Sequence, residues 1–175
     1  MKLETARPYA EALRELLAPH CERIEIAGSV RRCKPEVGDI ELVAIPKLVP
    51  ALDLFADAPA VRSPHFADAV LMMGTIEAGN PTTGKYVKIM AGDENPIQID
   101  LFCAVPENWG WIFALRTGSA DFSHRVFAAG LNRVGLTSRD GMIQSITTDR
   151  PVHCREERDL FALIGVPFVE PERRL

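Results

Sequence analysis

The sequence predicts an α+β fold with two lobes, and three observations point to it. Over residues 3–17 apolar side chains recur every three or four positions, which is typical of an amphipathic helix. Residues 24–45 and 74–102 hold short alternating or apolar segments between turn residues, and these predict the strands of a mixed sheet. Proline and glycine within 106–110 mark a lobe boundary, after which helical patterns surround one small hairpin.

The composition is that of a globular protein. Of the 175 residues, 47% are hydrophobic and 25% are charged, which suits one ordinary domain or two small lobes. No apolar run approaches the ~18–20 residues that span a bilayer, and residues 1–8 lack the apolar core of a signal peptide. We therefore expect a cytoplasmic protein that has no membrane partner.

The net charge of −4 comes from the first 105 residues, which hold 11 Lys and Arg against 15 Asp and Glu. Basic surface supplies most nonspecific affinity for nucleic acid, so any such binding is expected to be weak and salt-sensitive. The four cysteines are irregularly spaced, which predicts reduced structural thiols rather than a disulfide framework. The pairs His20-Cys21 and His153-Cys154 lack the ligand spacing of a zinc site.

The N-terminal helix is expected over 3–17, with Pro8 near its first turns and Pro19 after its end. Residues 24–45 then predict a strand, a tight turn, a short basic helix start, a loop and a second strand. In the second strand Asp39 and Glu41 share one face, with α-carbons roughly 6.5–7 Å apart. Two carboxylates this close repel each other unless a cation lies between them, which points to a divalent metal ion.

The turn before this acid pair predicts an anion site. Gly28 lets the backbone approach a ligand closely, and the free N–H groups at Gly28-Ser29 are those that bind phosphate at a helix start. Arg31 and Arg32 follow at once, and an arginine fork suits phosphate oxygens. A phosphate site therefore precedes the proposed metal site by a few residues.

Residues 47–66 contain prolines and no clear period, so irregular structure is expected, with one helical turn near 52–55. The apolar run 69–73 suits either a strand or a helix. Residues 74–78 and 86–90 flank G-N-P-T-T-G and predict a hairpin. Beside its turn, Lys85 and Lys88 either contact phosphate groups or form an ordinary solvated face.

The strand predicted over 97–102 places Asp100 on the face opposite Ile99 and Leu101, and an acid in so apolar a strand needs a partner. Beyond the lobe boundary, 109–116 is apolar and suits a core helix. Its Trp109 and Trp111 are as consistent with packing as with base stacking.

Three further elements complete the chain. Ser119 can cap a helix that runs to about residue 134. Residues 136–146 predict a hairpin that turns at 139–141. A final helix is expected over 156–164, and it ends at Gly165.

Four segments resemble the family X DNA polymerases, within the DNA polymerase beta superfamily of nucleotidyltransferases. G-S-V-R-R at 28–32 followed by G-D-I-E at 38–41 resembles their signature, and 97–102 resembles the strand that carries their third catalytic Asp. R-T-G-S at 116–119 resembles their nucleotide-binding turn, and 157–174 resembles their C-terminal end. The segments occur in the family's order and cover the chain almost end to end.

The resemblance implies a nucleotidyltransferase palm with a mixed β-sheet over 1–105 and a small C-terminal α/β thumb-like lobe over 106–175. The chain resembles the most compact viral members, which consist of these two lobes alone. The family's N-terminal lyase domain has no room before the first strand, so lyase activity is not expected.

The resemblance also implies the site. Asp39, Glu41 and Asp100 would be the catalytic residues and would hold two Mg²⁺ ions, for which Mn²⁺ can substitute. A cis peptide is implied between Gly118 and Ser119. The nucleotide-binding residues would be Gly28, Ser29, Arg32, Leu115, Arg116, Gly118, Ser119 and Ser123.

The chain departs from the family pattern at several of these positions. The family usually has Asp where this chain has Glu41, although the wider superfamily accepts Glu. It commonly has two aromatic residues where this chain has Leu115 and Arg116, and longer polar residues at Ala120 and Ser123. We expect modest nucleotide affinity and weak selection against ribose, unless the turn's backbone alone excludes the 2′-hydroxyl.

The implied function is a template-directed DNA polymerase that extends a primer 3′-hydroxyl, in repair or gap filling, and releases pyrophosphate. Its partners would be primer-template or gapped DNA and nucleoside triphosphates. We expect a monomer, and no protein partner can be inferred. Two alternatives stay open: a template-independent nucleotidyltransferase acting on a 3′ end, a protein or a small molecule, and a noncatalytic nucleic-acid-binding protein.

Overall fold

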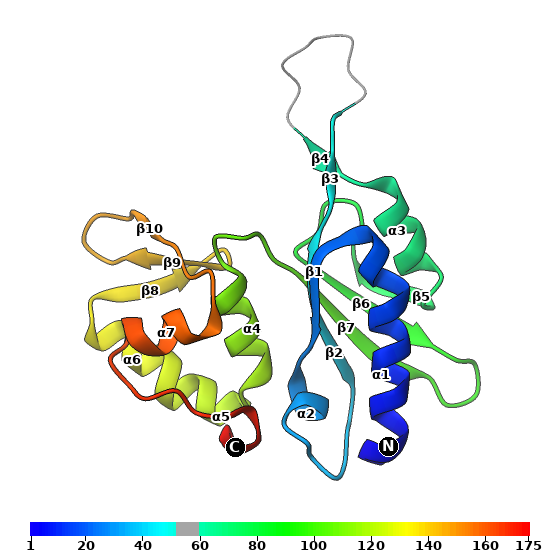
Figure 1. The fold of residues 1–175 in the computed structure, drawn as a ribbon, viewed down its shortest axis with the longest axis horizontal. Helices are drawn as coiled ribbons and strands as arrows, with labels where there is room; N and C mark the ends of the chain where they lie inside the picture. The colour runs from blue at the N-terminus through cyan, green and yellow to red at the C-terminus, as the bar shows by residue number, and fades with distance from the viewer. Residues whose placement is uncertain (52–59) are drawn as a thin grey trace.

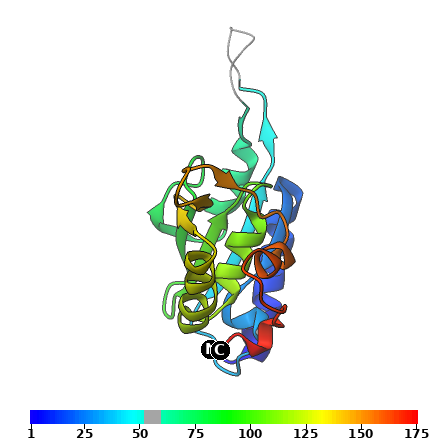
Figure 2. The same cartoon turned by 90° about the vertical axis from the view of Figure 1, so that its left-hand side faces the viewer.

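The computed structural model describes residues 1–51 and 60–175, which form two α+β lobes side by side (Figure 1). Both termini lie at the same end of the molecule in two perpendicular views (Figure 2). A two-stranded ribbon projects from the N-terminal lobe at the opposite end. None of the helices in the described ranges combines the length and hydrophobicity that a membrane span requires.

The N-terminal lobe is built on a mixed five-stranded sheet, as predicted. Its spatial order is β1 (Cys21–Ile26), β2 (Ile40–Pro46), β7 (Ile97–Cys103), β6 (Tyr86–Ala91) and β5 (Thr75–Gly79). β2 and β7 run parallel, and every other neighbouring pair is antiparallel. The predicted hairpin of β5 and β6 is confirmed.

Helices α1 (Leu3–Leu17) and α3 (Pro64–Leu71) cover one face of this sheet (Figure 1). That face is apolar because alternate strand residues point into it, and its largest fully buried side chains are Leu17, Phe66 and the strand residues Ile40, Leu42, Ile89, Ile99 and Leu101. The opposite face carries Val43, Ile45 and Phe102, which pack against α4 (Trp109–Thr117). Glu41 and Asp100 lie on this second face by the same alternation.

The C-terminal lobe packs short helical segments, the last of them η3 (Pro171–Arg173), beside a three-stranded sheet. The chain passes through α5 (Ala120–Phe122), the π-helical η2 (Ser123–Ala128), α6 (Ala129–Arg133), β8 (Leu136–Arg139), β9 (Met142–Ser145), β10 (Pro151–Val152) and α7 (Glu157–Leu163). The sheet order is β10-β9-β8. Phe127 and Phe161 lie at the centre of its core, with ring centroids 5.4 Å apart.

Helix α4 belongs to both lobes, because Trp109 and Phe113 pack on the N-terminal sheet whereas Trp111 and Ala114 pack in the C-terminal core. Stacking of bases on either Trp is contradicted by burial, since the two side chains are 1% and 4% exposed. All four cysteines are free thiols, as predicted.

One local expectation was wrong. The region expected to be irregular contains β3 (Leu48–Val49) and β4 (Val61–Arg62), paired antiparallel. The helix expected from residue 120 to 134 is confirmed, because the chain is helical from Ala120 to Arg133, but its middle segment η2 is π-helical. The run 69–73 belongs to the end of α3, and the helical turn expected at 52–55 lies outside the described residues.

Candidate active site

Helix α2 (Gly28–Arg31) begins directly after β1 and contacts β2. Gly28 has a φ of +60°, and a Cβ built there would lie only 1.9 Å from Glu41 Oε2. Glycine is therefore required for the Glu41 carboxylate to pack against the chain at this point. The neighbouring Ser29 is buried, and its hydroxyl has no hydrogen-bond partner among the described residues.

The acids lie on adjacent strands. Glu41 of β2 and Asp100 of β7 are direct register partners, so their side chains emerge side by side on the face that meets α4. Asp100 accepts a hydrogen bond from Tyr86 Oη at 2.8 Å and one from Gln98 Nε2 at 3.0 Å. These two donors are the partners that the buried acid needs, and they hold its carboxylate in one orientation.

Asp39, Glu41 and Asp100 form the acid set of the site, and its electrostatics disfavour the negative charge of Glu41 and Asp39. Burial and the neighbouring Asp39 raise the pKa of Glu41 to about 7, and Asp100 adds to this. Burial and Asp100 also raise the pKa of Asp39. Arg32 and Arg116 act on Glu41 in the opposite direction. Carboxyl groups placed like this are fully ionised at neutral pH only with more positive charge nearby.

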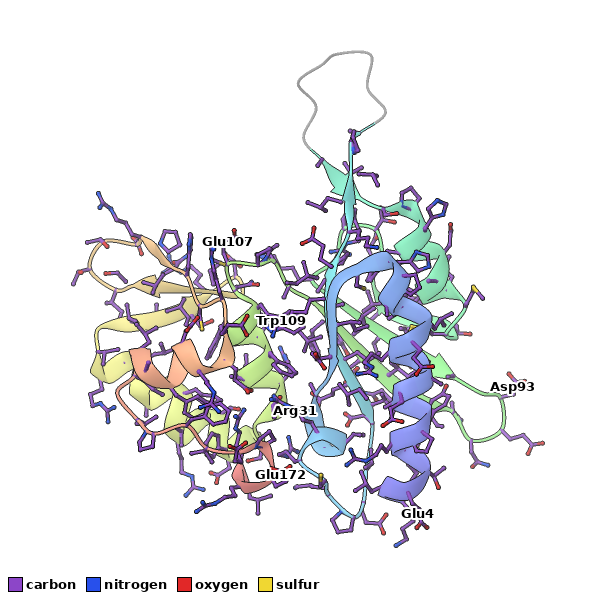
Figure 3. All side chains as sticks on the ribbon, in the orientation of Figure 1. Glu4, Arg31, Asp93, Glu107, Trp109 and Glu172 are labelled. Carbon is purple, nitrogen blue, oxygen red and sulfur yellow. The ribbon has the colours of Figure 1, made fainter. Side chains whose placement is uncertain are left out.

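The two arginines after Ser29 have different surroundings. Arg31 donates to Glu157 Oε1 and Oε2 at 2.7 and 2.8 Å and to Thr117 Oγ1 at 2.6 Å, so it links the lobes (Figure 3). The expectation that Arg31 takes part in phosphate binding is therefore wrong, because a buried carboxylate already occupies its fork. Arg32 donates to the Thr117 carbonyl, and its Nε has no partner among the described residues.

The R-T-G-S turn follows the end of α4. Ser119 Oγ accepts a hydrogen bond from the Phe122 backbone N–H at 3.0 Å, which confirms the predicted cap. Ser123 Oγ donates to the Leu115 carbonyl at 3.3 Å. The expected cis peptide between Gly118 and Ser119 is wrong, since the described residues contain none. Both residues are extended, and a trans bond already satisfies the turn's hydrogen bonds, so nothing offsets the cost of the cis form.

A cavity of about 400 Å³ brings most of the predicted residues together between the lobes. Arg32, Asp39 and Glu41 line it from the N-terminal lobe. From the C-terminal lobe it is lined by Leu115, Arg116, Gly118, Ser119, Ala120 and Ser123. Gly28 packs against Glu41, and Asp100 is the register partner of Glu41 on the next strand. Neither Gly28 nor Asp100 lines the cavity itself.

Comparison with known proteins agrees with this arrangement. The family described as DNA polymerase beta thumb matches residues 114–175, which include the turn and the rest of the C-terminal lobe. Leishmania infantum polymerase beta in a ternary P/T complex is similar with a TM-score of 0.73 and 18% identity, over 100% of this chain and 76% of that one. The fold is that of a DNA polymerase beta. The structure of Leishmania infantum polymerase beta in a ternary gap complex is also similar, with a TM-score of 0.72 and 16% identity. This match covers 99% of the present chain and 70% of the Leishmania chain. No curated protein matches the sequence.

The predicted α+β fold is thus confirmed, and the match of residues 114–175 to the polymerase beta thumb agrees with the family resemblance. The family resemblance implies a divalent metal ion. The carboxylates of Asp39, Glu41 and Asp100 fit such an ion, because carboxylate oxygens are the ligands that Mg²⁺ prefers. The raised pKa of Glu41 also calls for a cation nearby. Within residues 1–51 and 60–175, however, no three His, Cys, Asp or Glu side chains converge into a metal-binding group.

Several partners of the polymerase-like site were missed from the sequence. Tyr86 and Gln98 orient Asp100, and Gln98 could have been found because it lies two residues before Asp100 on the same strand face. Of the two lysines left open, Lys85 donates to the Asp140 carbonyl at 2.8 Å and Lys88 pairs with Glu77 at 2.6 Å. Both lysines therefore have protein partners.

Proposed function

We propose that this polymerase-like chain is a DNA-directed DNA polymerase that adds nucleotides to a primer 3′-hydroxyl, in repair or gap filling. The observation that carries the proposal is the cavity in which acids of one lobe face the R-T-G-S turn of the other. The similarity to a polymerase beta found in ternary P/T and gap complexes supports DNA as the partner. Residues 1–105 would act as the palm and 106–175 as the thumb-like lobe of a monomer.

The nucleotide would bind in this cavity. Gly28, Ser29 and Arg32 would contact the β- and γ-phosphates, which is supported by the unpartnered Ser29 hydroxyl and Arg32 Nε. Leu115, Arg116, Gly118, Ser119 and Ser123 would face the sugar and the base. Gly118 and Ser119 have extended backbone and line this side of the cavity.

Asp39, Glu41 and Asp100 would hold two Mg²⁺ ions, or Mn²⁺ in their place. When bound, such ions lower the pKa of the attacking hydroxyl and offset the charge of the transferred phosphoryl group. Tyr86 and Gln98 fix the orientation of Asp100, and the absence of a side chain at Gly28 leaves room for Glu41. The remaining contribution of the protein is to position the hydroxyl and the triphosphate, which this chemistry requires most.

The test is extension of single-stranded, recessed and one-nucleotide-gapped DNA with each dNTP supplied singly. We expect incorporation that follows the template base. Glu41→Gln and Asp100→Ala should each slow extension by about a hundredfold or more while the protein stays folded. Glu36→Gln, an exposed carboxylate paired with Lys2, is the matched control and should not change the rate.

The outcomes separate the possible functions. Incorporation that ignores the template base would replace the polymerase with a template-independent nucleotidyltransferase. Full extension by Asp100→Ala would show that Asp100 is a structural acid held by Tyr86 and Gln98. No incorporation on any substrate, together with measurable DNA affinity, would favour a noncatalytic binding protein.

A further inference from the structure

A second cavity lies in the C-terminal lobe. It has a volume of about 330 Å³, at the lower end of the range of about 300–1,000 Å³ that is typical of small-molecule sites. Its lining residues come from α4, η2, α6 and β8 (Figure 1). Leu115 and Ser123 line this cavity and also the one between the lobes, so the two cavities share a wall.

The lining of the second cavity is apolar at its buried side and polar at its rim. Trp111 and Leu131 are 4% and 2% exposed, whereas His124, Asn132 and Ser138 are exposed. The three exposed side chains form no hydrogen bond within the described part of the chain. Imidazole, amide and hydroxyl groups can each donate and accept. A ligand therefore meets an apolar floor and neutral donors and acceptors around its edge.

The second cavity also lacks charge. None of its lining residues is Asp, Glu, Lys or Arg, whereas two guanidinium groups and two carboxylates line the cavity between the lobes. Arginines adjacent to the lining residues in sequence have other partners, since Arg125 pairs with Asp121 and Arg133 donates to the Ile164 carbonyl. Phosphate calls for charge-assisted hydrogen bonds and Mg²⁺ for carboxylates. The second cavity is therefore suited to an uncharged ligand.

The backbone of one wall gives an independent indication of a site. Ser123, His124 and Ala128 belong to the π-helical segment η2. A π-helical turn is rare and occurs frequently at functional sites. Here it forms the side of the cavity that carries the exposed imidazole.

We propose that the second cavity binds an uncharged nucleobase, distinct from the base of the incoming nucleotide. A nucleobase is flat and neutral, with apolar faces and with donors and acceptors on its edge, which matches the floor and the rim. Unpaired bases are held by aromatic rings and by hydrogen bonds to their edges, and His124 offers an exposed ring where the buried Trp111 does not. The base belongs either to a free nucleoside or to an unpaired position of bound DNA. The inference rests on the proposed function only for this class of ligand.

The test follows ¹⁹F NMR of the whole chain labelled with 5-fluorotryptophan, in which Trp109→Phe assigns the signals of the two tryptophans. Trp111 lines the cavity, and Trp109, which packs on the N-terminal sheet, is the internal reference. Adenosine, guanosine, cytidine and thymidine are titrated singly. At least one should shift the Trp111 signal with a Kd of about 0.1–1 mM, as expected for so small a ligand, and leave Trp109 unchanged. Ribose should shift neither signal.

Two adjacent alanines provide the matched control. Ala128 lines the cavity, whereas Ala129 is exposed and does not. Ala128→Leu fills space in the cavity and should abolish the shift, and Ala129→Leu should leave it unchanged. Circular dichroism checks the fold of both variants. Asn132→Ala, at an exposed position, should weaken binding three- to tenfold through loss of a hydrogen bond, and it serves if Ala128→Leu does not fold.

Two DNA samples identify the source of the base. One is gapped DNA with a single unpaired template base, and the other is the same DNA with an abasic site at that position. A Trp111 shift that needs the base and disappears in Ala128→Leu would assign the site to DNA. A shift with nucleosides but with neither DNA would assign it to free nucleosides. Either result supports a nucleobase site.

No shift of Trp111 with any nucleoside or unpaired base would overturn the inference. A shift that persists in Ala128→Leu would overturn it too, and so would one that ribose reproduces. Template-directed extension by the same protein would then leave the proposed function standing. Conversely, nucleoside binding by a chain that extends no primer would sustain the inference while the proposed function fails.

Discussion

Arg32 connects the acids of the cavity to the R-T-G-S turn. Its guanidinium lines the cavity beside Asp39 and Glu41, donates to the Thr117 carbonyl and keeps one N–H free of described partners. A guanidinium holds phosphate through two parallel hydrogen bonds, whereas a lysine offers a point charge. We expect Arg32→Lys to raise the nucleotide KM by about tenfold and to leave primer-template affinity unchanged. Steady-state kinetics and fluorescence anisotropy would measure the two. A loss of DNA affinity without a change in KM would assign the arginine to the duplex.

If a nucleotide binds in the cavity as proposed, Leu115 would decide how crowded the side that faces its sugar is. Its side chain lines the cavity, and its carbonyl accepts the Ser123 hydroxyl. Rejection of a ribose depends on a contact that the extra 2′-hydroxyl cannot enter, and a flexible leucine can yield. We expect the wild type to select dGTP over GTP only weakly opposite a template C. Leu115→Tyr should improve the ratio of kcat/KM values by about tenfold. Strong rejection of GTP by the wild type would mean that the backbone of the turn is enough.

Residues near the acids show what sequence reasoning can reach. Alternation along an expected strand puts Asp39 and Glu41 on one face, and both line the cavity, although β2 begins only at Ile40. Tyr86 reaches Asp100 only through the register of β6 on β7, which the sequence does not specify. Arg31 and Arg32 give the same signal in sequence, but Glu157, 126 residues away, binds Arg31. Their roles therefore differ through a long-range contact.

Helices and strands could be predicted from the sequence where the periodic spacing of their apolar residues extends over several helical turns or several strand residues. Helix α1 and the strands β2, β6 and β7 each carry enough apolar positions to define a buried face. The strands β3, β4 and β10 have two residues each, which is too short for any alternation. The π-helical segment η2 also lacks a local cause in sequence, because its residues suit an α-helix equally well.

Close packing of α4 on the N-terminus of α7 depends on Gly110. A Cβ at this position would lie 2.2 Å from the carbonyl oxygen of Glu156, which is backbone and cannot rotate away. Alanine normally stabilises a helix relative to glycine by about 1 kcal/mol. Here the clash should dominate, and we expect Gly110→Ala to lower the free energy of unfolding by about 1–3 kcal/mol.

Urea unfolding would measure this, with Gly130→Ala as the matched control. A Cβ at Gly130 would meet the side chain of Ile164 at 3.0 Å, and a side chain can shift where a backbone carbonyl cannot. The control should therefore lose less stability than Gly110→Ala. A Gly110→Ala variant more stable than the wild type would show that α4 and α7 can move apart without cost.

At the scale of the whole molecule, charged side chains join the two lobes. Arg23 pairs with Glu156 at 2.7 Å in an exposed position, and its guanidinium lies 4.4 Å from the centroid of the Trp109 ring. Glu157 is buried and receives both Arg31 and Arg174, at 2.7 and 2.6 Å. Figure 3 shows Arg31 and Trp109 between the lobes. The buried group fixes the position of α2, and with it the distance between the acids and the R-T-G-S turn.

This group predicts a pH-dependent stability. Burial would raise the pKa of Glu157, but hydrogen bonds from Arg31 and Arg174 outweigh it and hold that pKa below its ordinary value. A carboxyl of this kind stabilises the fold above its unfolded pKa, and the contribution is lost as pH falls through the folded pKa. At pH 7, Glu157→Gln should therefore lower the free energy of unfolding by about 3–5 kcal/mol, since it leaves two arginines without their anion. The deficit should shrink as the pH falls below the ordinary glutamate pKa of about 4.3 and disappear once the pH is below the lower pKa that Glu157 has in the folded protein.

Urea unfolding across this pH range checks the prediction, and the adjacent Glu156→Gln is its matched control. Glu156 pairs with an arginine at the surface, where water screens the interaction, so its replacement should cost about 1 kcal/mol or less. Gln at 156 also keeps an oxygen acceptor for the N-terminus of α7, which leaves that helix intact. Equal losses in the two variants, or a deficit in Glu157→Gln that stays constant with pH, would mean that the buried carboxylate contributes no more than the exposed one. In that case the apolar packing of α4 on both lobes would have to hold the cavity in shape.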